Sequence, residues 1–121
     1  MDQLKEFEDT FLELYVSADI LLSQSKPKST VILLSKALFA LLDYIIFKKF
    51  KKVADNHADR FRILRIKLPT LYNTVDNVWN KYTDTYTKPA VEETINLLKG
   101  AIKEISNHET VSQKIKEAIK W

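Results

Sequence analysis

Residues 30–65 read TVILLSKALFALLDYIIFKKFKKVADNHADRFRILR, a helix that is apolar nearly all round followed by a basic segment. Within residues 31–47 only Ser35, Lys36 and Asp43 interrupt the apolar side chains. A helix that is apolar on every side has to be covered by other helices of its own chain or by a second copy of the chain. This segment therefore predicts a helical bundle and favours a homodimer.

The composition favours a single all-α domain. The chain has 121 residues, enough for one domain with a sizeable core but too few for two. Its 45% apolar and 29% charged residues are typical of a soluble globular protein, and one glycine and three prolines leave few of the turns that an all-β chain needs. We therefore expect one helical domain that spans residues 1–121.

The same sequence suggests a cytoplasmic protein. The chain has no cysteine, which excludes disulfides, cysteine zinc sites and thiol nucleophiles. Its acidic start, Met1-Asp2-Gln3, is unlike a secretory or organellar signal. Lys36 and Asp43 would both be costly at the centre of a bilayer, so we expect a buried core helix and no contact with a membrane.

Apolar spacings of three and four residues predict six helices, separated by prolines and polar caps. Asn56 is expected to cap the third helix, with Asp59 reaching back as a capping box, and Ser106-Asn107 to cap the last helix. Phe61 is expected to face inward and Arg60 to lie outward. The helices are expected over residues 2–23, 27 to about 53, 57 to about 67, 71–86, 89–105 and 109–121, the last being short.

Charge is segregated along the chain, although the net charge is only +3. Residues 1–25 contain six acids and one lysine, whereas residues 48–67 contain eight bases and two aspartates. These segments are either solvated faces that offset one another, or a basic surface whose field concentrates phosphate groups. The small net charge argues against a dedicated, high-affinity nucleic-acid binder.

No motif for catalysis or metal binding accompanies the basic segment. His57 and His108 are the only histidines, and they lie 51 positions apart, so no pair of histidines builds a metal site on one helix. A single glycine excludes the glycine-rich loops that bind phosphates. We expect no catalytic residue, no metal and no cofactor.

The start of the helix after Asn56 is the best candidate for an anion site. His57, Arg60 and Arg65 lie on the helix whose N-terminal end attracts anions, and Lys52 precedes it. A capping histidine with solvated arginines is the alternative interpretation.

A tyrosine-rich segment offers a second kind of contact. The rings of Tyr72, Trp79, Tyr82 and Tyr86 could stack on a base, with Tyr82 and Tyr86 as the preferred candidates. Aromatic residues at helical spacing also suit a core or a subunit interface, so both interpretations stay open.

The order of these features resembles the HEPN family of small helical domains. An acidic amphipathic helix precedes the apolar helix with SKALFALLDY at residues 35–44, and NHADRFRIL follows at residues 56–64. YTDTY at residues 82–86 then precedes Pro89 and an amphipathic helix. The resemblance covers residues 5–106. It implies an up-and-down bundle of four or five helices, similar to substrate-binding subunits of nucleotidyltransferases, that forms a homodimer and partners a nucleotidyltransferase in prokaryotic toxin–antitoxin or defence systems.

The sequence departs from active members of that family at one motif. Those members cleave RNA without metal through an arginine followed a few residues later by a histidine, and here Arg60, Arg62 and Arg65 precede no histidine before His108. His57 comes before Arg60, which reverses the order. The resemblance therefore implies a non-catalytic domain.

Three functions follow in order of preference. The first is a non-enzymatic homodimer that binds a nucleotide, RNA or a nucleotidyltransferase-type partner through its basic surface. The second is a metal-independent ribonuclease with a degenerate site, formed by His57 with Arg60 or Arg65. The third is a pure protein-interaction module. The candidate binding residues are Arg60, Arg65, Lys52, His57, Tyr82 and Tyr86.

Overall fold

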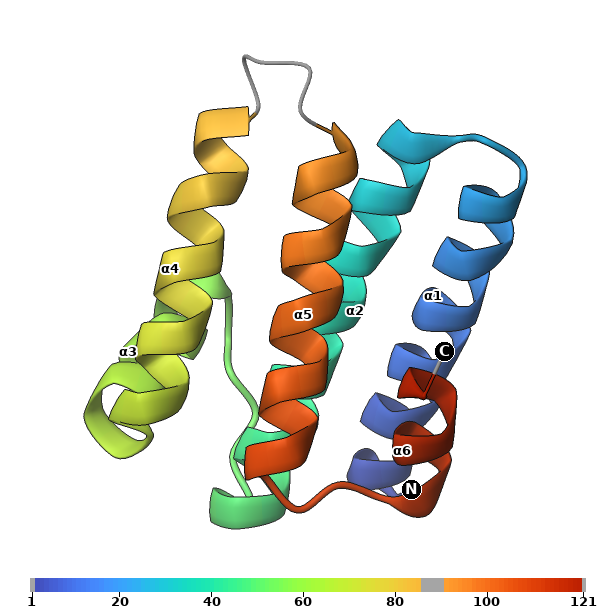
Figure 1. Cartoon of the computed structure of the whole chain (residues 1–121). Helices are drawn as coiled ribbons and strands as arrows, with labels where there is room; N and C mark the ends of the chain where they lie inside the picture. The colour runs from blue at the N-terminus through green and yellow to red at the C-terminus, as the bar shows by residue number, and fades with distance from the viewer. Residues whose placement is uncertain (1, 86–90, 121) are drawn as a thin grey trace.

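A computed structural model describes residues 2–85 and 91–120, with side chains for residues 2–80 and 92–120. Six helices and no strand occur in these residues, so the all-α prediction is confirmed (Figure 1). Two antiparallel pairs, α1 with α2 and α4 with α5, form the body of the molecule. The helices are α1 (Gln3–Ser23), α2 (Pro27–Phe50), α3 (His57–Lys67), α4 (Pro69–Thr85), α5 (Val91–His108) and α6 (Gln113–Ile119).

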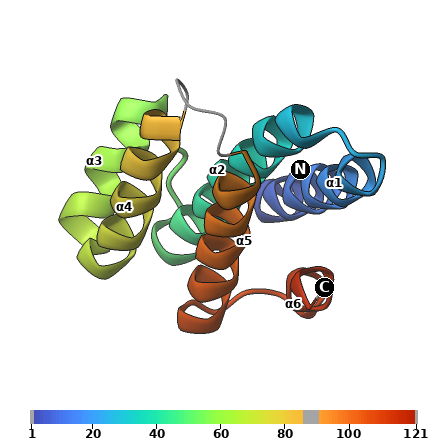
Figure 2. The same cartoon turned by 45° about the horizontal axis from the view of Figure 1, so that its top comes forward.

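The apolar helix α2 is the centre of the core. It packs against α1, α5 and α3, and half of its 24 residues are buried. Figure 2 shows α2 between α1 on one side and α3 and α4 on the other, with α5 in front of it. The chain's own helices therefore cover most of α2, as its composition requires. One strip stays open, because Ile32 is 53% exposed and Lys36 is also exposed.

By length and composition α2 is also long enough to cross a membrane. Most of the apolar window that meets this test is buried inside the bundle, as in the core helix of a soluble protein. The helix is therefore weak support for a membrane span.

The helix boundaries follow local backbone chemistry. The expected end of α2 near Val53 is wrong, since the helix stops at Phe50 and Lys51 adopts a left-handed conformation with φ of 56°. The expected cap of α3 is confirmed, because Asn56 Oδ1 accepts a hydrogen bond from Asp59 N at 2.9 Å. Asp59 Oδ2 accepts in turn from Asp55 N at 3.0 Å, one residue before the expected position.

The C-terminal boundary differs most from the prediction. Ser106-Asn107 does not cap the last helix, since α5 continues to His108 and Ser112 caps α6 by accepting from Ile115 N at 3.3 Å. The apolar face of α5 explains the difference. Ser106 follows the buried Ile105 and is itself buried, so ending the helix there would uncover part of the core. α6 then returns along α1.

Candidate functional site

The open strip of α2 forms the floor of a groove of about 560 Å³. The walls come from α1 on one side and from α3 and α4 on the other. We call it the α2 groove. Its lining residues are Phe7, Thr10, Ile32, Ser35, Lys36, Phe39, Ala40, Asp43, His57, Arg60 and Trp79.

A two-pronged ion pair closes one end of the α2 groove. Arg60 Nε donates to Asp43 Oδ1 at 2.7 Å and Arg60 Nη2 donates to Asp43 Oδ2 at 3.0 Å. The Arg60 side chain is only 12% exposed, so the expectation that Arg60 lies outward is wrong. Parallel hydrogen bonds of this type fix a guanidinium in both position and orientation. The pair explains how an apolar helix tolerates an aspartate in its core segment.

His57 completes this cluster. Its Nδ1 lies 2.6 Å from Arg60 Nη1, and since a guanidinium only donates, Nδ1 is the acceptor and the ring proton is on Nε2. The His57 ring meets Phe39 edge-on at a centroid distance of 4.5 Å, and the Arg60 guanidinium lies 5.2 Å from the same Phe39 centroid. The cluster is therefore held by two aspartate bonds, one histidine bond and one ring.

Aromatic contacts extend the wall beyond the ion pair. The ring of Trp79 lies 5.8 Å from that of Phe39 and 6.0 Å from that of Phe61. Tilted ring pairs at such distances stabilise a packed surface. α3 and α4 are thereby attached to α2 as one unit, although Trp79 keeps about a third of its surface exposed.

A second group of cations comes from the last turn of α2, the connection that follows it and α3. Lys48 Nζ is 5.6 Å from the Tyr44 ring, and Lys51 Nζ is 5.4 Å from the Phe47 ring. Lys67 Nζ, from the end of α3, is 5.1 Å from the Phe50 ring. These ammonium groups rest on aromatic faces while their outer sides meet solvent. With the exposed Lys52 and Arg65, they form what we call the basic surface: Lys48, Lys51, Lys52, Arg65 and Lys67.

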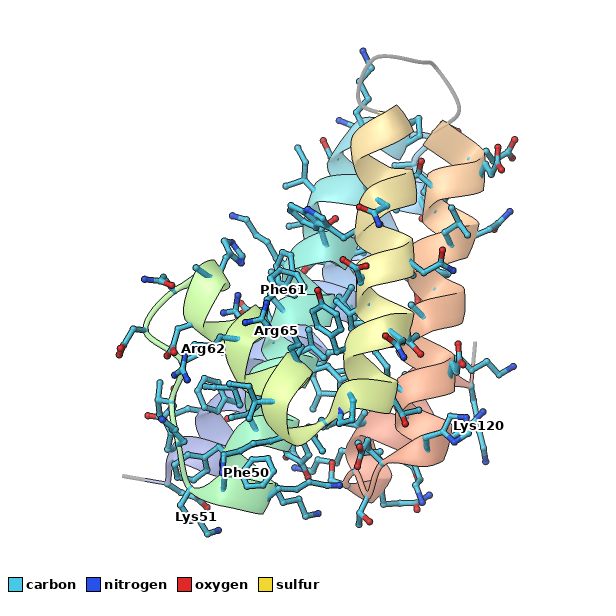
Figure 3. The ribbon with its side chains drawn as sticks, turned by 90° about the vertical axis from the view of Figure 1, so that its left-hand side faces the viewer. Phe50, Lys51, Phe61, Arg62, Arg65 and Lys120 are labelled. Carbon is cyan, nitrogen blue, oxygen red and sulfur yellow. The ribbon has the colours of Figure 1, made fainter. Side chains whose placement is uncertain are left out.

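The cations of the basic surface form no short ion pairs within the described residues, although Lys52 lies near enough to Asp59 to help lower the pKa of that carboxyl. Over residues 2–80 and 92–120, none of the five makes an ion pair with a carboxylate. Their neighbours differ, since Lys49 pairs with Glu109 at 2.8 Å and Arg62 with Asp59 at 2.6 Å. Figure 3 shows Lys51 at the end of α2 and Arg65 on α3 on the same side of the molecule.

The predicted site residues thus fall into separate places. His57 and Arg60 are together in the α2 groove, while Lys52 and Arg65 belong to the basic surface. Tyr82 lies in the part of α4 described only by its backbone, and Tyr86 lies outside the described residues. Their roles stay predictions.

Two residues of the α2 groove were missed as site residues, Asp43 and Phe39, and Trp79 was considered only for stacking on a base. Asp43 carried a usable signal, because a single acid inside an apolar helix needs a buried cationic partner. Arg60 was the nearest candidate for that partner in the following helix. Phe39 gave no such signal, since apolar helices contain aromatic residues for packing alone.

The described residues contain no group of three acids, histidines or cysteines that is placed to hold a metal ion. Comparisons with models of protein families, with curated proteins and with solved structures found no match. A function for this chain has therefore to be inferred from the geometry of the α2 groove and the basic surface.

Proposed function

We propose that this chain is a non-catalytic, HEPN-like domain that forms a homodimer and binds single-stranded RNA through the basic surface. The main support for this proposal is that five cations make no ion pair with a carboxylate in the described part of the chain: Lys48, Lys51, Lys52, Arg65 and Lys67. A cation without an acidic partner is available to a phosphate without first losing an internal bond.

The arrangement of these cations favours RNA over a single nucleotide. They come from the end of α2, from the connection to α3 and from α3 itself, and four of the five are exposed. Five cations exceed what one phosphate group needs, whereas several phosphates of a strand could each use one. The small net charge of +3 implies weak binding that depends strongly on salt.

The Asp43–Arg60–His57 cluster supports a non-catalytic domain. Arg60 already donates to Asp43 and His57, so a phosphate would have to compete with a two-pronged carboxylate for its guanidinium. Metal-independent cleavage of RNA needs a cation for the scissile phosphate and a group for proton transfer. The 2.6 Å contact of His57 with Arg60 keeps a degenerate ribonuclease as the second candidate.

The α2 groove supports the homodimer. It contains Ile32, which is 53% exposed on the strip of α2 that no helix of the described chain covers, and the partly exposed Trp79 on the wall formed by α4. Covering such a strip with the same strip of a second copy would bury apolar surface symmetrically. The resemblance to HEPN domains implies the same assembly.

Fluorescence anisotropy with a labelled single-stranded RNA tests the proposal. The double variant Lys52→Gln/Arg65→Gln removes two exposed cations without breaking an ion pair of the described residues. We expect weaker binding and a dependence of log K on log salt that is shallower by about 1.4, since each phosphate contact to single strands contributes about 0.7.

The matched control is Lys28→Gln, an exposed lysine at the opposite end of α2, which should leave affinity and slope unchanged. Equal losses in both variants would contradict the basic surface as the binding site. Shortening of the RNA during the same incubation in chelator, abolished by His57→Ala, would instead favour the ribonuclease.

A further inference from the structure

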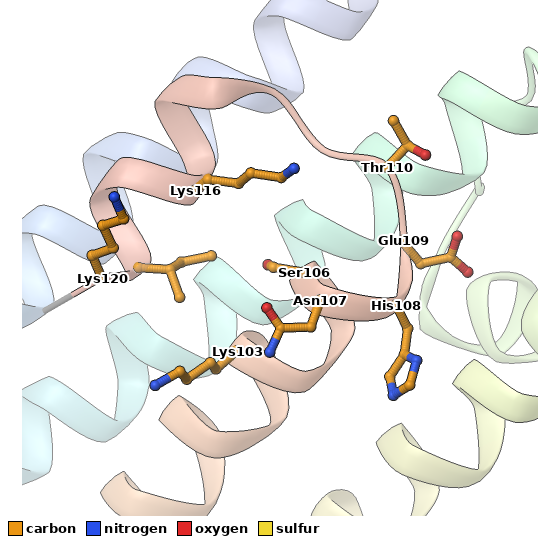
Figure 4. A pocket seen from close by; sticks show the side chains of 9 residues that line it. Lys103, Ser106, Asn107, His108, Glu109, Thr110, Lys116 and Lys120 are labelled. Carbon is orange, nitrogen blue, oxygen red and sulfur yellow. The ribbon is translucent and has the colours of Figure 1, made fainter.

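A second concave site lies where α5 ends and α6 packs back on the bundle. The pocket has a volume of about 480 Å³. We call it the C-terminal pocket, and its residues differ from those of the α2 groove and the basic surface (Figure 4). Its lining residues are Lys103, Ser106, Asn107, His108, Glu109, Thr110, Lys116, Ile119 and Lys120.

The pocket is strongly cationic. Lys103 comes from α5, and Lys116 and Lys120 lie one turn apart on the chain that forms and follows α6. None of these three lysines makes an ion pair within the described residues. Three ammonium groups around one hollow create a local field that attracts anions.

The one acid of the lining does not offset these lysines. Glu109 Oε2 lies 2.8 Å from Lys49 Nζ, and the Glu109 side chain is only 13% exposed. Figure 4 shows its carboxylate directed away from Lys116 and Lys120. Glu109 is therefore already neutralised by α2, and the pocket keeps the charge of its three lysines.

An unused buried hydroxyl belongs to the same pocket. Ser106 is 5% exposed, and its Oγ has no hydrogen-bond partner among the residues that the structure describes. The buried hydroxyls of α2 behave differently, since Thr30 Oγ1 and Ser35 Oγ each donate at 2.8 Å to a backbone carbonyl one turn earlier. Buried polar atoms nearly always have a partner, so an exception needs an explanation such as a ligand.

The orientation of Ser106 points to that ligand. In Figure 4 its Oγ is directed toward α6, into the space between Lys116 and Asn107. A hydroxyl and a side-chain amide both donate hydrogen bonds, and lysines supply charge without a fixed direction. Donors and cations around a hollow without a free acid are the requirements of a phosphate oxyanion.

We propose that the C-terminal pocket binds a phosphate group. Lys103, Lys116 and Lys120 supply the charge, the Asn107 amide supplies a donor, and Ser106 supplies a hydroxyl that has no other partner among the described residues. The proposal does not depend on RNA binding at the basic surface. A free phosphate ion and a phosphate monoester share this chemistry, and the experiment separates them.

Isothermal titration of the full chain at low ionic strength, with inorganic phosphate and with adenosine 5′-monophosphate, tests the site. We expect saturable binding of one molecule per chain. Equal affinities would identify the phosphate group alone as the ligand, whereas tighter binding of the nucleotide would identify a monoester. Absence of saturable binding by either probe would overturn the proposal.

Two variants assign the binding to this pocket. Lys116→Gln/Lys120→Gln should weaken binding about tenfold or more, while Lys114→Gln, an exposed lysine of α6 outside the lining, should not change it. Ser106→Ala should weaken binding about tenfold, because a hydrogen bond to a charged group is lost.

The melting temperature of Ser106→Ala without ligand distinguishes a serine that binds a ligand from a serine with a purely structural role. Removing an unpartnered buried hydroxyl should leave the melting temperature of the free protein unchanged or raise it, while the increase produced by phosphate becomes smaller. A melting temperature that falls in the free protein, with an unchanged phosphate response, would overturn the role of Ser106 and with it the site.

Discussion

The α2 groove and the basic surface both present arginine and lysine, yet they treat these residues in opposite ways. In the groove, Arg60 is 12% exposed and its donors go to Asp43 and His57. On the basic surface, Arg65 and Lys52 are exposed and make no ion pair with a carboxylate within the described chain. The first cation joins helices to one another, and the others remain available for a partner.

A basic segment of sequence can therefore contain two kinds of cation, buried and exposed. A buried cation loses its hydration, and attraction to a fixed acid has to offset that loss. Its charge is therefore balanced inside the protein and is not available to a ligand. An exposed cation stays hydrated at little cost and interacts with whatever anion approaches. Position along the sequence does not distinguish the two cases, because Arg60 and Arg65 lie on the same helix.

The largest expected effect comes from breaking the internal pair. Asp43→Ala leaves the Arg60 guanidinium with little exposure and without its carboxylate, so the free energy of unfolding should fall by about 2–3 kcal/mol. Urea denaturation followed by circular dichroism measures the change. Arg62→Ala is the control, since it breaks the exposed pair with Asp59 and should cost under about 0.5 kcal/mol.

A double variant distinguishes the lost pair from a general packing defect. Asp43→Leu/Arg60→Met replaces both charges by apolar side chains and should lie within about 1 kcal/mol of the original protein. If the double variant were less stable than Asp43→Ala, the cluster would be held mainly by packing around Phe39 and not by its charges.

The apolar residues that line the α2 groove give the second prediction. Ile32→Glu replaces an apolar side chain of the open strip by a charged one and should weaken a homodimer at least tenfold, because the carboxylate would lose its hydration at the contact. Native mass spectrometry across a dilution series measures the effect.

Val16→Glu is the matched control for this experiment. Val16 is 49% exposed, close to the 53% of Ile32, but it lies on α1 outside the α2 groove. A dimer that dissociates equally in both variants would place the contact elsewhere, and a monomer at every concentration would remove the homodimer from the proposal.

The sequence predicted most of the fold because its strongest signals are local. Apolar periodicity placed all six helices, and the Asn56 side chain predicted the start of α3. The errors occurred where tertiary contacts override local preference. Ser106 looks like a cap, but the buried face of α5 continues through it.

The candidate site was less predictable for a related reason. Periodicity assigned Arg60 to the outer face, whereas its long side chain reaches 17 positions back to Asp43. Spacing within one helix contains no information about a partner on another helix. The C-terminal pocket could not be predicted at all, because it requires knowing that α6 folds back toward the end of α5.

The smallest expected effect concerns Asp59, whose partner Arg62 is exposed, unlike Arg60 in the pair with Asp43. The backbone N–H of Asp55 and the guanidinium of Arg62 hold the pKa of Asp59 below its ordinary value of 3.8. A lowered pKa in the folded state means that the stabilisation is complete above pH 3.8 and disappears as the pH falls through the lower folded value.

Asp59→Asn should therefore make stability depend less steeply on pH below 3.8. Thermal melts between about pH 2 and 5 measure this slope, with Asp9→Asn, an exposed aspartate that accepts no hydrogen bond from the described residues, as the control. An equal change of slope in both variants would mean that the cap of α3 contributes nothing specific, and that the stability of α3 comes from its buried residues and from Arg60 alone.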